Sequence, residues 1–229
     1  AYIDNIINTA LNEDINYIDV TTDNLISEDH TSSAYYIAKD TGVLCGIDIA
    51  KRVFELAGGN VEFETLINDG AEVKKGDIIA KMKGSTATLL KGERTALNLL
   101  QHLSGIATAT NKCVKLVEGT KASITDTRKT LPGLRALQKY AVTVGGGKNH
   151  RFNLSDGAML KDNHLDAYGG ITGAVTALRK KIGSKLTEAH VDQTMIKKIV
   201  GHSGAMTLTE RVYTHLDIET LVEAINKIT

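Results

Sequence analysis

Basic side chains gather in one stretch of a chain whose charges otherwise balance. Arg128 and Lys129 lie close together, and His150 and Arg151 follow shortly after three glycines at 145–147. An arginine can hold a carboxylate or a phosphate through two parallel hydrogen bonds, and a lysine adds a point charge. A histidine adds a donor whose charge changes near neutral pH. This set is typical of a pocket for a small ligand with several negative charges.

Two further basic residues extend this hypothesis from other parts of the chain. Arg94 lies in a helix-like stretch, and Lys161 lies near the end of a strand-like stretch. Taken singly, such residues more often form surface ion pairs. The glycines at 145–147 also have two interpretations: they let the backbone approach an anion, or they end a helix and begin a loop. Only the whole set indicates a site.

The composition limits what the protein can be. The chain has 27 basic and 27 acidic side chains, which argues against a broad nucleic-acid surface because such surfaces usually have a basic surplus. Cys45 and Cys113 form neither a disulfide framework nor a metal-binding spacing, so we expect a reducing, cytoplasmic location. No apolar run reaches the length of a membrane span and no signal-peptide pattern begins the chain, so we expect no membrane association.

The elements that must position these residues change in character along the chain. Residues 1–105 begin with an amphipathic, helix-like segment at 1–15 and contain a second helix-like segment at 47–59 that two glycines close. Between and after them lie short β-prone segments separated by turn residues, at 33–38, 61–67 and 71–84. This pattern predicts an α+β lobe built around a small β-sandwich.

Helix-like and strand-like segments alternate in the following part of the chain. One long helix or two in succession are predicted at 92–118, further helices at 134–144 and 169–183, and strands at 122–127 and 157–163. Such alternation indicates a parallel, barrel-like α/β arrangement over residues 106–185. In barrels of this kind the chemistry lies at the carboxyl ends of the strands. Arg128 and Lys129 directly follow one predicted strand, and Lys161 lies near the end of the other.

Several long motifs narrow the interpretation. They are DVTTDNLI at 19–26, GVLCGI at 42–47, GERTALNLLQHLSGIAT at 92–108, DTRKTLPGLR at 126–135 and GGGKNHRFNLSDGAMLKDNH at 145–164. With these motifs, residues 4–185 resemble the quinolinate phosphoribosyltransferase family, also called nicotinate-nucleotide diphosphorylase (carboxylating). The resemblance implies an N-terminal open sandwich followed by an α/β barrel, here incomplete. It also implies a homodimer in which the barrel of one subunit and the sandwich lobe of its neighbour share an active site.

The resemblance also implies roles for the basic residues. Arg128 and Arg151, with Lys129 and His150, would bind the two carboxylates of quinolinate. Lys161 would lie on the substrate and phosphoribosyl side, so that Lys129 and Lys161 are the catalytic candidates. Arg94 would reach in from the neighbouring subunit. The implied reaction uses magnesium and phosphoribosyl pyrophosphate, and gives nicotinate mononucleotide, pyrophosphate and carbon dioxide in NAD biosynthesis.

The last part of the chain, residues 186–229, has a different character. The segments IKKIVGHSG at 196–204 and TERVYTH at 209–215 resemble the C-terminal end of a phage-type tyrosine recombinase. In that family the residues matching His202 and Tyr213 contact the phosphate and attack DNA. The other catalytic elements of that family do not precede them, so we expect no DNA cleavage and no nucleic-acid partner. A simpler interpretation is a short helical tail that covers the edge of the barrel.

The sequence therefore supports two hypotheses for the function of the protein. One is a phosphoribosyltransferase whose activity is weak, because the acidic residues expected to hold magnesium and ribose are not found before the tail begins. No metal ligands are identified in the sequence. The alternative is a non-catalytic chimera with a recombinase-derived tail.

Overall fold

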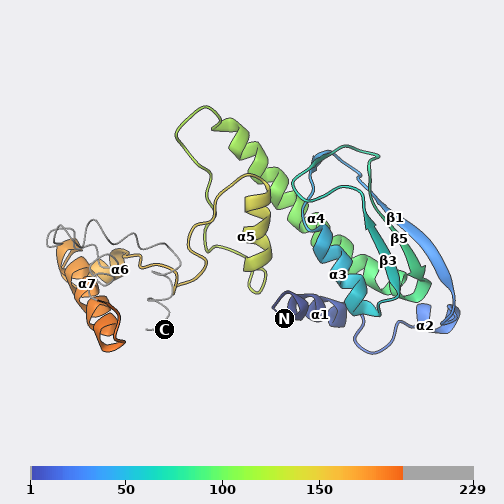
Figure 1. The fold of residues 1–229 in the computed structure, drawn as a ribbon, viewed down its shortest axis with the longest axis horizontal. Coiled ribbons are helices and arrows are strands. Elements are labelled where there is room, and N and C mark those ends of the chain that lie inside the picture. Colours follow the sequence, from blue (N-terminus) through green and yellow to red (C-terminus); the bar gives the residue numbers. More distant parts are fainter. Residues whose placement is uncertain (1, 193–229) are drawn as a thin grey trace. The chain divides into compact units, whose positions relative to one another are not determined.

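The computed structural model describes residues 2–192 (Figure 1). They divide into two compact units, one ending at residue 152 and one beginning at residue 153. The first unit contains a β-sheet, the helices that cover it and the segments that carry most of the predicted site. None of the helices in the described range is long and apolar enough to cross a membrane.

The sheet of the first unit is antiparallel and has three strands in the order β1-β5-β3. The strands are β1 (Thr31–Ile37), β3 (Val61–Thr65) and β5 (Ile78–Ser85), and a separate two-stranded ladder joins β2 (Gly42–Val43) to β4 (Glu72–Val73). Tyr36 pairs with Ala80, and Phe63 pairs with Met82. Because side chains alternate between the two faces of a strand, these residues share one face. That face is the buried one.

Helices cover the buried face of this sheet (Figure 1). They are α3 (Ile47–Ala57) and the long α4 (Thr86–Leu116), while α1 (Tyr2–Asp14) packs on these two helices and the short α2 (Thr22–Leu25) packs on α4. In α3, the buried side chains of Ile47, Ala50, Val53 and Phe54 recur at helical spacing and form a single apolar stripe. The ring of Phe54 lies within 6.4 Å of the ring of Tyr36, so this stripe joins the helix to the sheet.

A further helix, α5 (Arg135–Val144), packs on α4. Its buried side chains Leu137 and Ala141 belong to the common core. The hydroxyl of Tyr140 donates to Asp69 Oδ2 at 2.7 Å, and Asp69 also accepts from the backbone N–H groups that begin α3. Burial, and then the hydrogen bond to Asp69, raise the pKa of Tyr140. The α5 helix is therefore bound to the sheet-containing lobe.

The glycine run at 145–147 ends α5 and allows close packing against α4. Gly145 is the C-cap of α5, and a Cβ atom added to it would lie 2.4 Å from the carbonyl oxygen of Ala107. A Cβ atom on Gly147 would lie 2.7 Å from a methyl group of Val142. Of the two interpretations of this run, the structure confirms the helix end followed by a loop, because space for the backbone of α4 requires glycine here.

Replacing Gly145 with alanine is therefore expected to destabilise the protein by about 1–3 kcal/mol, because a backbone carbonyl must shift to make room for the methyl group. Chemical denaturation monitored by circular dichroism measures this loss. Gly105→Ala is the matched control. It lies on the exposed side of α4 with nothing within 4 Å of an added Cβ, so its higher helix propensity stabilises the protein by about 1 kcal/mol. Equal effects of the two substitutions would contradict the packing argument.

The second unit contains two helices in its described part, α6 (Asp162–Ala167) and α7 (Ile171–Glu188). They pack on one another, and α7 buries Ala174 and Leu186. Gly170 precedes α7 with a φ of 117°, a backbone conformation that favours glycine. The helix predicted at 169–183 is thus confirmed.

The other helices and the N-terminal strands predicted from the sequence are also present, and the mixed α/β class is confirmed. The helix predicted at 92–118 begins earlier, at Thr86, and runs without a break through the domain boundary predicted between residues 105 and 106. The two strands predicted at 122–127 and 157–163 are wrong. After Ser85 the described chain contains no strand, only an isolated parallel bridge between Thr125 and Lys148.

The reason lies in how parallel strands are stabilised. Their backbone groups are satisfied by neighbouring strands of the same sheet, not by groups close in sequence. Segment 122–127 has one neighbour, through Lys148, and segment 157–163 leads directly into α6. The partial barrel is therefore not confirmed. His202 and Tyr213, and with them most of the predicted tail, lie outside the described residues.

Candidate functional site

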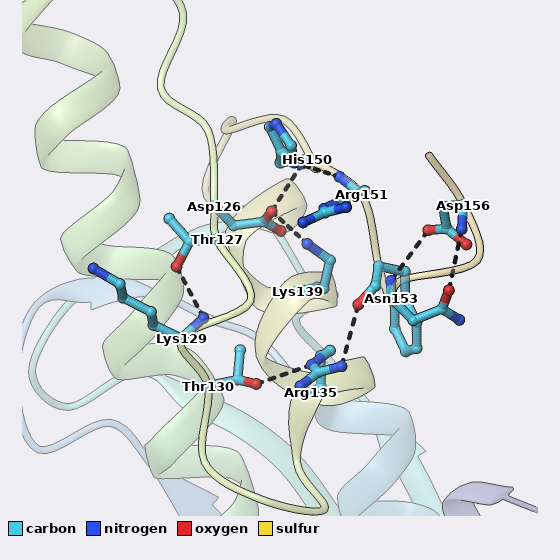
Figure 2. Close-up of polar contacts among 11 residues, drawn as sticks. Asp126, Thr127, Lys129, Thr130, Arg135, Lys139, His150, Arg151, Asn153 and Asp156 are labelled. Atoms are coloured by element: carbon cyan, nitrogen blue, oxygen red, sulfur yellow. Dashed lines mark hydrogen bonds and ion pairs between the residues drawn. The ribbon is translucent and has the colours of Figure 1, made fainter. Parts of the chain in front are cut away.

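Two segments that are distant in sequence lie side by side in the first unit and carry most of the predicted site (Figure 2). The Lys148 N–H group donates to the Ile124 carbonyl oxygen at 2.9 Å, and the Asp126 N–H group donates to the Lys148 carbonyl oxygen at 3.1 Å. The His150 N–H group then donates to Asp126 Oδ1 at 2.8 Å. These bonds bring residues 124–126 next to residues 148–150, so Arg128 and Arg151 follow closely after the paired residues.

A buried ion pair lies where the two segments meet. The ammonium of Lys139, on α5, contacts Asp126 Oδ1, and the two side chains are only 3% and 7% exposed. The second carboxylate oxygen, Oδ2, accepts from the side-chain amide of Asn149 at 2.6 Å when the amide nitrogen faces Asp126. Figure 2 shows Lys139 rising from α5 toward Asp126. The pair thus ties α5 to both segments.

Arg128 presents an unsatisfied donor in this region. Its Nε atom is buried, and no hydrogen-bond partner for it exists among residues 2–192. Buried donors in folded proteins almost always have an acceptor, because an unpaired one costs free energy. The Nε of Arg128 is therefore available to an acceptor from outside the protein, such as an oxygen of a ligand or of water. This is the most specific observation at the site.

The neighbouring basic side chains differ in their surroundings. His150 is exposed, and its Nδ1 accepts from the Arg151 N–H group at 2.8 Å. An accepting Nδ1 leaves the ring proton on Nε2, so neutral His150 offers an outward N–H donor. Arg151 is half-buried. Lys129 is exposed, and in Figure 2 its side chain points away from Asp126 on the other side of the backbone.

Residues of α5 hold the same segments in place. Arg135 donates from Nε to Thr130 Oγ1 at 3.1 Å and from Nη1 to the Phe152 carbonyl oxygen at 3.3 Å. Gln138 accepts from the Leu131 N–H group at 3.0 Å. One helix therefore contacts both basic segments and the loop between them.

The remaining two predicted residues are not part of this cluster within the first unit. Arg94 is exposed on α4. It lies eight residues before His102, the α4 residue that contacts Gln138 of α5, which is about 12 Å along the helix axis. Lys161 belongs to the second unit, where it is exposed and precedes α6, and its N–H group donates to His164 Nδ1 at 3.0 Å. Of the predicted residues, the two paired segments therefore carry Arg128, Lys129, His150 and Arg151, and the Lys129 side chain is directed away from Asp126.

The described residues contain no group of side chains that would by itself hold the magnesium implied by the family resemblance. No group of three or more histidine, cysteine, aspartate or glutamate side chains within residues 2–192 could hold a metal ion. Asp126 lies among the basic residues, but both of its oxygens already accept hydrogen bonds from the protein. Magnesium is usually bound by one or two carboxylates together with substrate phosphates, so the magnesium implied by the family resemblance stays a prediction.

The sequence did not reveal the importance of Asp126, Lys139 and Asn149. Leu137 and Ala141 mark the core-facing side of α5, and Lys139 falls on the opposite side by helical geometry. A lysine on that side of a helix is predicted to be exposed to solvent. In the fold, segments 122–126 and 148–150 pack on this side of α5 and bury Lys139. The sequence pattern does not show that these segments lie there.

The fold and the paired segments together define a class: a mixed α/β protein that carries a group of basic residues on two adjacent segments. Models of two family domains match almost consecutive parts of the chain. The quinolinate phosphoribosyl transferase N-terminal domain matches residues 19–104, and the C-terminal domain of the same family matches residues 106–205. The chain belongs to the quinolinate phosphoribosyltransferase family.

Individual relatives agree with this assignment. The chain is 43% identical over 189 residues to a nicotinate-nucleotide pyrophosphorylase [carboxylating] of Mycobacterium leprae, covering 81% of this chain and 66% of that protein. It is 46% identical over 171 residues to a probable enzyme of the same name from Bacillus subtilis, covering 75% and 59%. The crystal structure of NadC from Streptococcus pyogenes matches with a TM-score of 0.75 and 35% identity, covering 99% and 80%.

These matches bear on the extent of the family and on the alternative hypothesis. The chain spans between about half and two thirds of the length of the curated relatives it matches. The C-terminal family domain extends to residue 205, past the limit at residue 185 that the motifs indicated. The comparisons do not support the alternative of a non-catalytic chimera.

Proposed function

We propose that the protein acts in the nicotinate-nucleotide diphosphorylase (carboxylating) reaction. In this reaction quinolinate and phosphoribosyl pyrophosphate give nicotinate mononucleotide, pyrophosphate and carbon dioxide. The observation that carries the proposal is the buried Arg128 Nε without an acceptor, in a cluster with Lys129, His150 and Arg151. A dicarboxylate supplies acceptors and negative charge to such a cluster. The relatives named above carry the corresponding activity in their names.

The geometry suggests a role for each residue of the cluster. Arg128 and Arg151 each have the planar donor fork that fits a carboxylate, one for each carboxylate of quinolinate. His150 directs its Nε2 donor outward, toward a ligand oxygen. Lys129 adds a positive charge on the exposed side of its segment.

In this reaction the protein positions the two substrates and stabilises the charge that develops on them. The bond from the anomeric carbon of the ribose to pyrophosphate breaks with its electron pair going to pyrophosphate, and the ring nitrogen of quinolinate forms the new bond. The carbon–carbon bond to the adjacent carboxylate then breaks, its electrons are drawn into the cationic ring, and a proton takes the place of carbon dioxide. Arginines that hold both carboxylates fix the ring nitrogen for attack.

Several parts of the proposal come from the family resemblance alone. They are the roles of Arg94, from a neighbouring subunit of a homodimer, and of Lys161 on the phosphoribosyl side. The requirement for magnesium, the partial barrel over residues 106–185 and the cytoplasmic location belong to the same group. Arg94 is exposed on α4 and free for contact with a second copy, since it has no hydrogen bond or ion pair within the described chain.

Calorimetric titration with quinolinate and with nicotinate tests the proposal. Nicotinate has the same ring but one carboxylate fewer, so it engages one arginine fewer. A hydrogen bond to a charged group contributes about 1.5–3 kcal/mol, and we therefore expect quinolinate to bind at least about tenfold more tightly. Product formation with phosphoribosyl pyrophosphate and magnesium is measured on the same sample.

The control is Lys121→Ala, which removes an exposed basic residue from the same inter-helix segment but outside the cluster. It is expected to bind quinolinate as the unaltered chain does. Absence of quinolinate binding, or equal affinity for the two pyridine carboxylates, would overturn the proposal.

A further inference from the structure

We propose that Asp126 and Lys139 are positioning residues, a buried pair that sets the separation of the two anion-binding segments. What the segments bind rests on the proposed function, whereas the positioning itself does not. Asp126 lies two residues before Arg128, and its partner His150 directly precedes Arg151. A displacement of the Asp126 carboxylate therefore changes the distance between the two arginines.

The hydrogen bonds of Asp126 show that it serves the protein and not a ligand. Oδ1 accepts from the Lys139 ammonium and from the His150 N–H group, and Oδ2 accepts from the Asn149 amide. These donors come from α5 and from the segment 148–151, while Asp126 itself belongs to the other segment. A single carboxylate thus connects three parts of the chain.

The pair also connects the site to the rigid core. Lys139 lies on the side of α5 opposite Leu137 and Ala141, which pack in the core. Gly145 holds the end of the same helix against α4. Residues whose orientation is fixed by packing and by surrounding hydrogen bonds can hold binding groups within the narrow tolerance that recognition requires. The pair therefore passes the rigidity of α5 to both segments.

The opposite charges of Asp126 and Lys139 also help to hold the two segments in place. Several positive groups in one cluster repel each other in the absence of a ligand. The positive charge of Lys139 is neutralised by Asp126, so it holds the segments without adding to this repulsion. A buried ion pair generally contributes little net stability compared with apolar packing, and fixing one geometry is a use attested in other proteins.

Hydrogen exchange followed by mass spectrometry, without any ligand, tests the positioning directly. Asp126→Glu keeps the charge but moves the carboxylate by one methylene group. We expect faster amide exchange in residues 122–130 and 147–152 and unchanged exchange in α3 and α4. Glu72→Asp is the control, because it alters by one methylene the carboxylate of an exposed pair with Lys115 and is expected to leave both segments unchanged. Uniformly faster exchange, or no change in the two segments, would contradict the proposal.

Quinolinate affinity provides the second measurement, made well below the Tm of each variant. Asp126→Glu is expected to bind about tenfold more weakly, as is usual when a supporting residue around a binding site is changed. In the Arg128→Ala background the same change is expected to have little further effect, because Asp126 acts through Arg128. Full additivity, or unchanged affinity, would reduce the pair to a purely structural role. If the unaltered chain binds no quinolinate, the proposed function fails, but the exchange experiment still decides the positioning.

Discussion

Arg128→Lys is expected to weaken quinolinate binding by about 10- to 100-fold without lowering the Tm of the free protein. Lysine keeps the positive charge but loses the planar fork and the Nε donor, and each hydrogen bond to a charged group contributes about 1.5–3 kcal/mol. In the free protein this Nε has no acceptor within the described chain. Removing it therefore relieves a cost in the free state and removes a contact only in the bound state. Calorimetry and thermal unfolding measure the two effects.

This combination distinguishes a binding group from a structural one. A structural arginine supports the fold, so its replacement lowers the Tm, whereas a binding site often reduces the stability of the free protein. Arg179→Lys, an exposed arginine of α7 outside the cluster, is the matched control and is expected to change neither quantity. A large decrease of the Tm on Arg128→Lys, with affinity unchanged, would show that Arg128 serves the fold alone.

The sequence predicted that Arg128, Lys129, His150 and Arg151 belong to one site, and the structure pairs the two segments that carry them. The pairing of the two segments that carry them could not be predicted. Helices form from contacts between residues three and four apart, and α3, α4 and α5 accordingly appear where the pattern places them. Parallel pairing joins residues that are far apart in sequence, as in the single bridge between Thr125 and Lys148. Local patterns do not contain that information.

Lys139 illustrates a second limit of sequence reasoning. Helical periodicity divides a helix into a core side and a solvent side, and it assigns a lysine opposite the apolar stripe to solvent. α5 is packed on two sides, by α4 and by the paired segments, so its second side is buried as well. The glycine run at 145–147 shows the opposite error. The sequence allowed it to bind an anion, but in the fold the backbone of Ala107 occupies the space next to Gly145.

Lys139→Met is expected to cost about 3–5 kcal/mol of unfolding free energy, because it leaves the buried carboxylate of Asp126 without its counter-ion. Methionine has a similar length and fills the space, so lost packing contributes little. The effect is large because both side chains of the pair are almost fully buried. Urea denaturation monitored by circular dichroism measures it.

Two further variants identify the uncompensated charge as the cause. Adding Asp126→Asn to Lys139→Met is expected to recover part of the loss, because a neutral amide needs no counter-ion and still accepts from the His150 N–H group. Lys115→Met breaks the exposed pair with Glu72, at 2.6 Å, and is expected to have a much smaller effect because solvent stabilises the remaining carboxylate. If the double variant is less stable than Lys139→Met, or if the two lysine variants lose equal stability, burial of the Asp126 charge does not explain the cost.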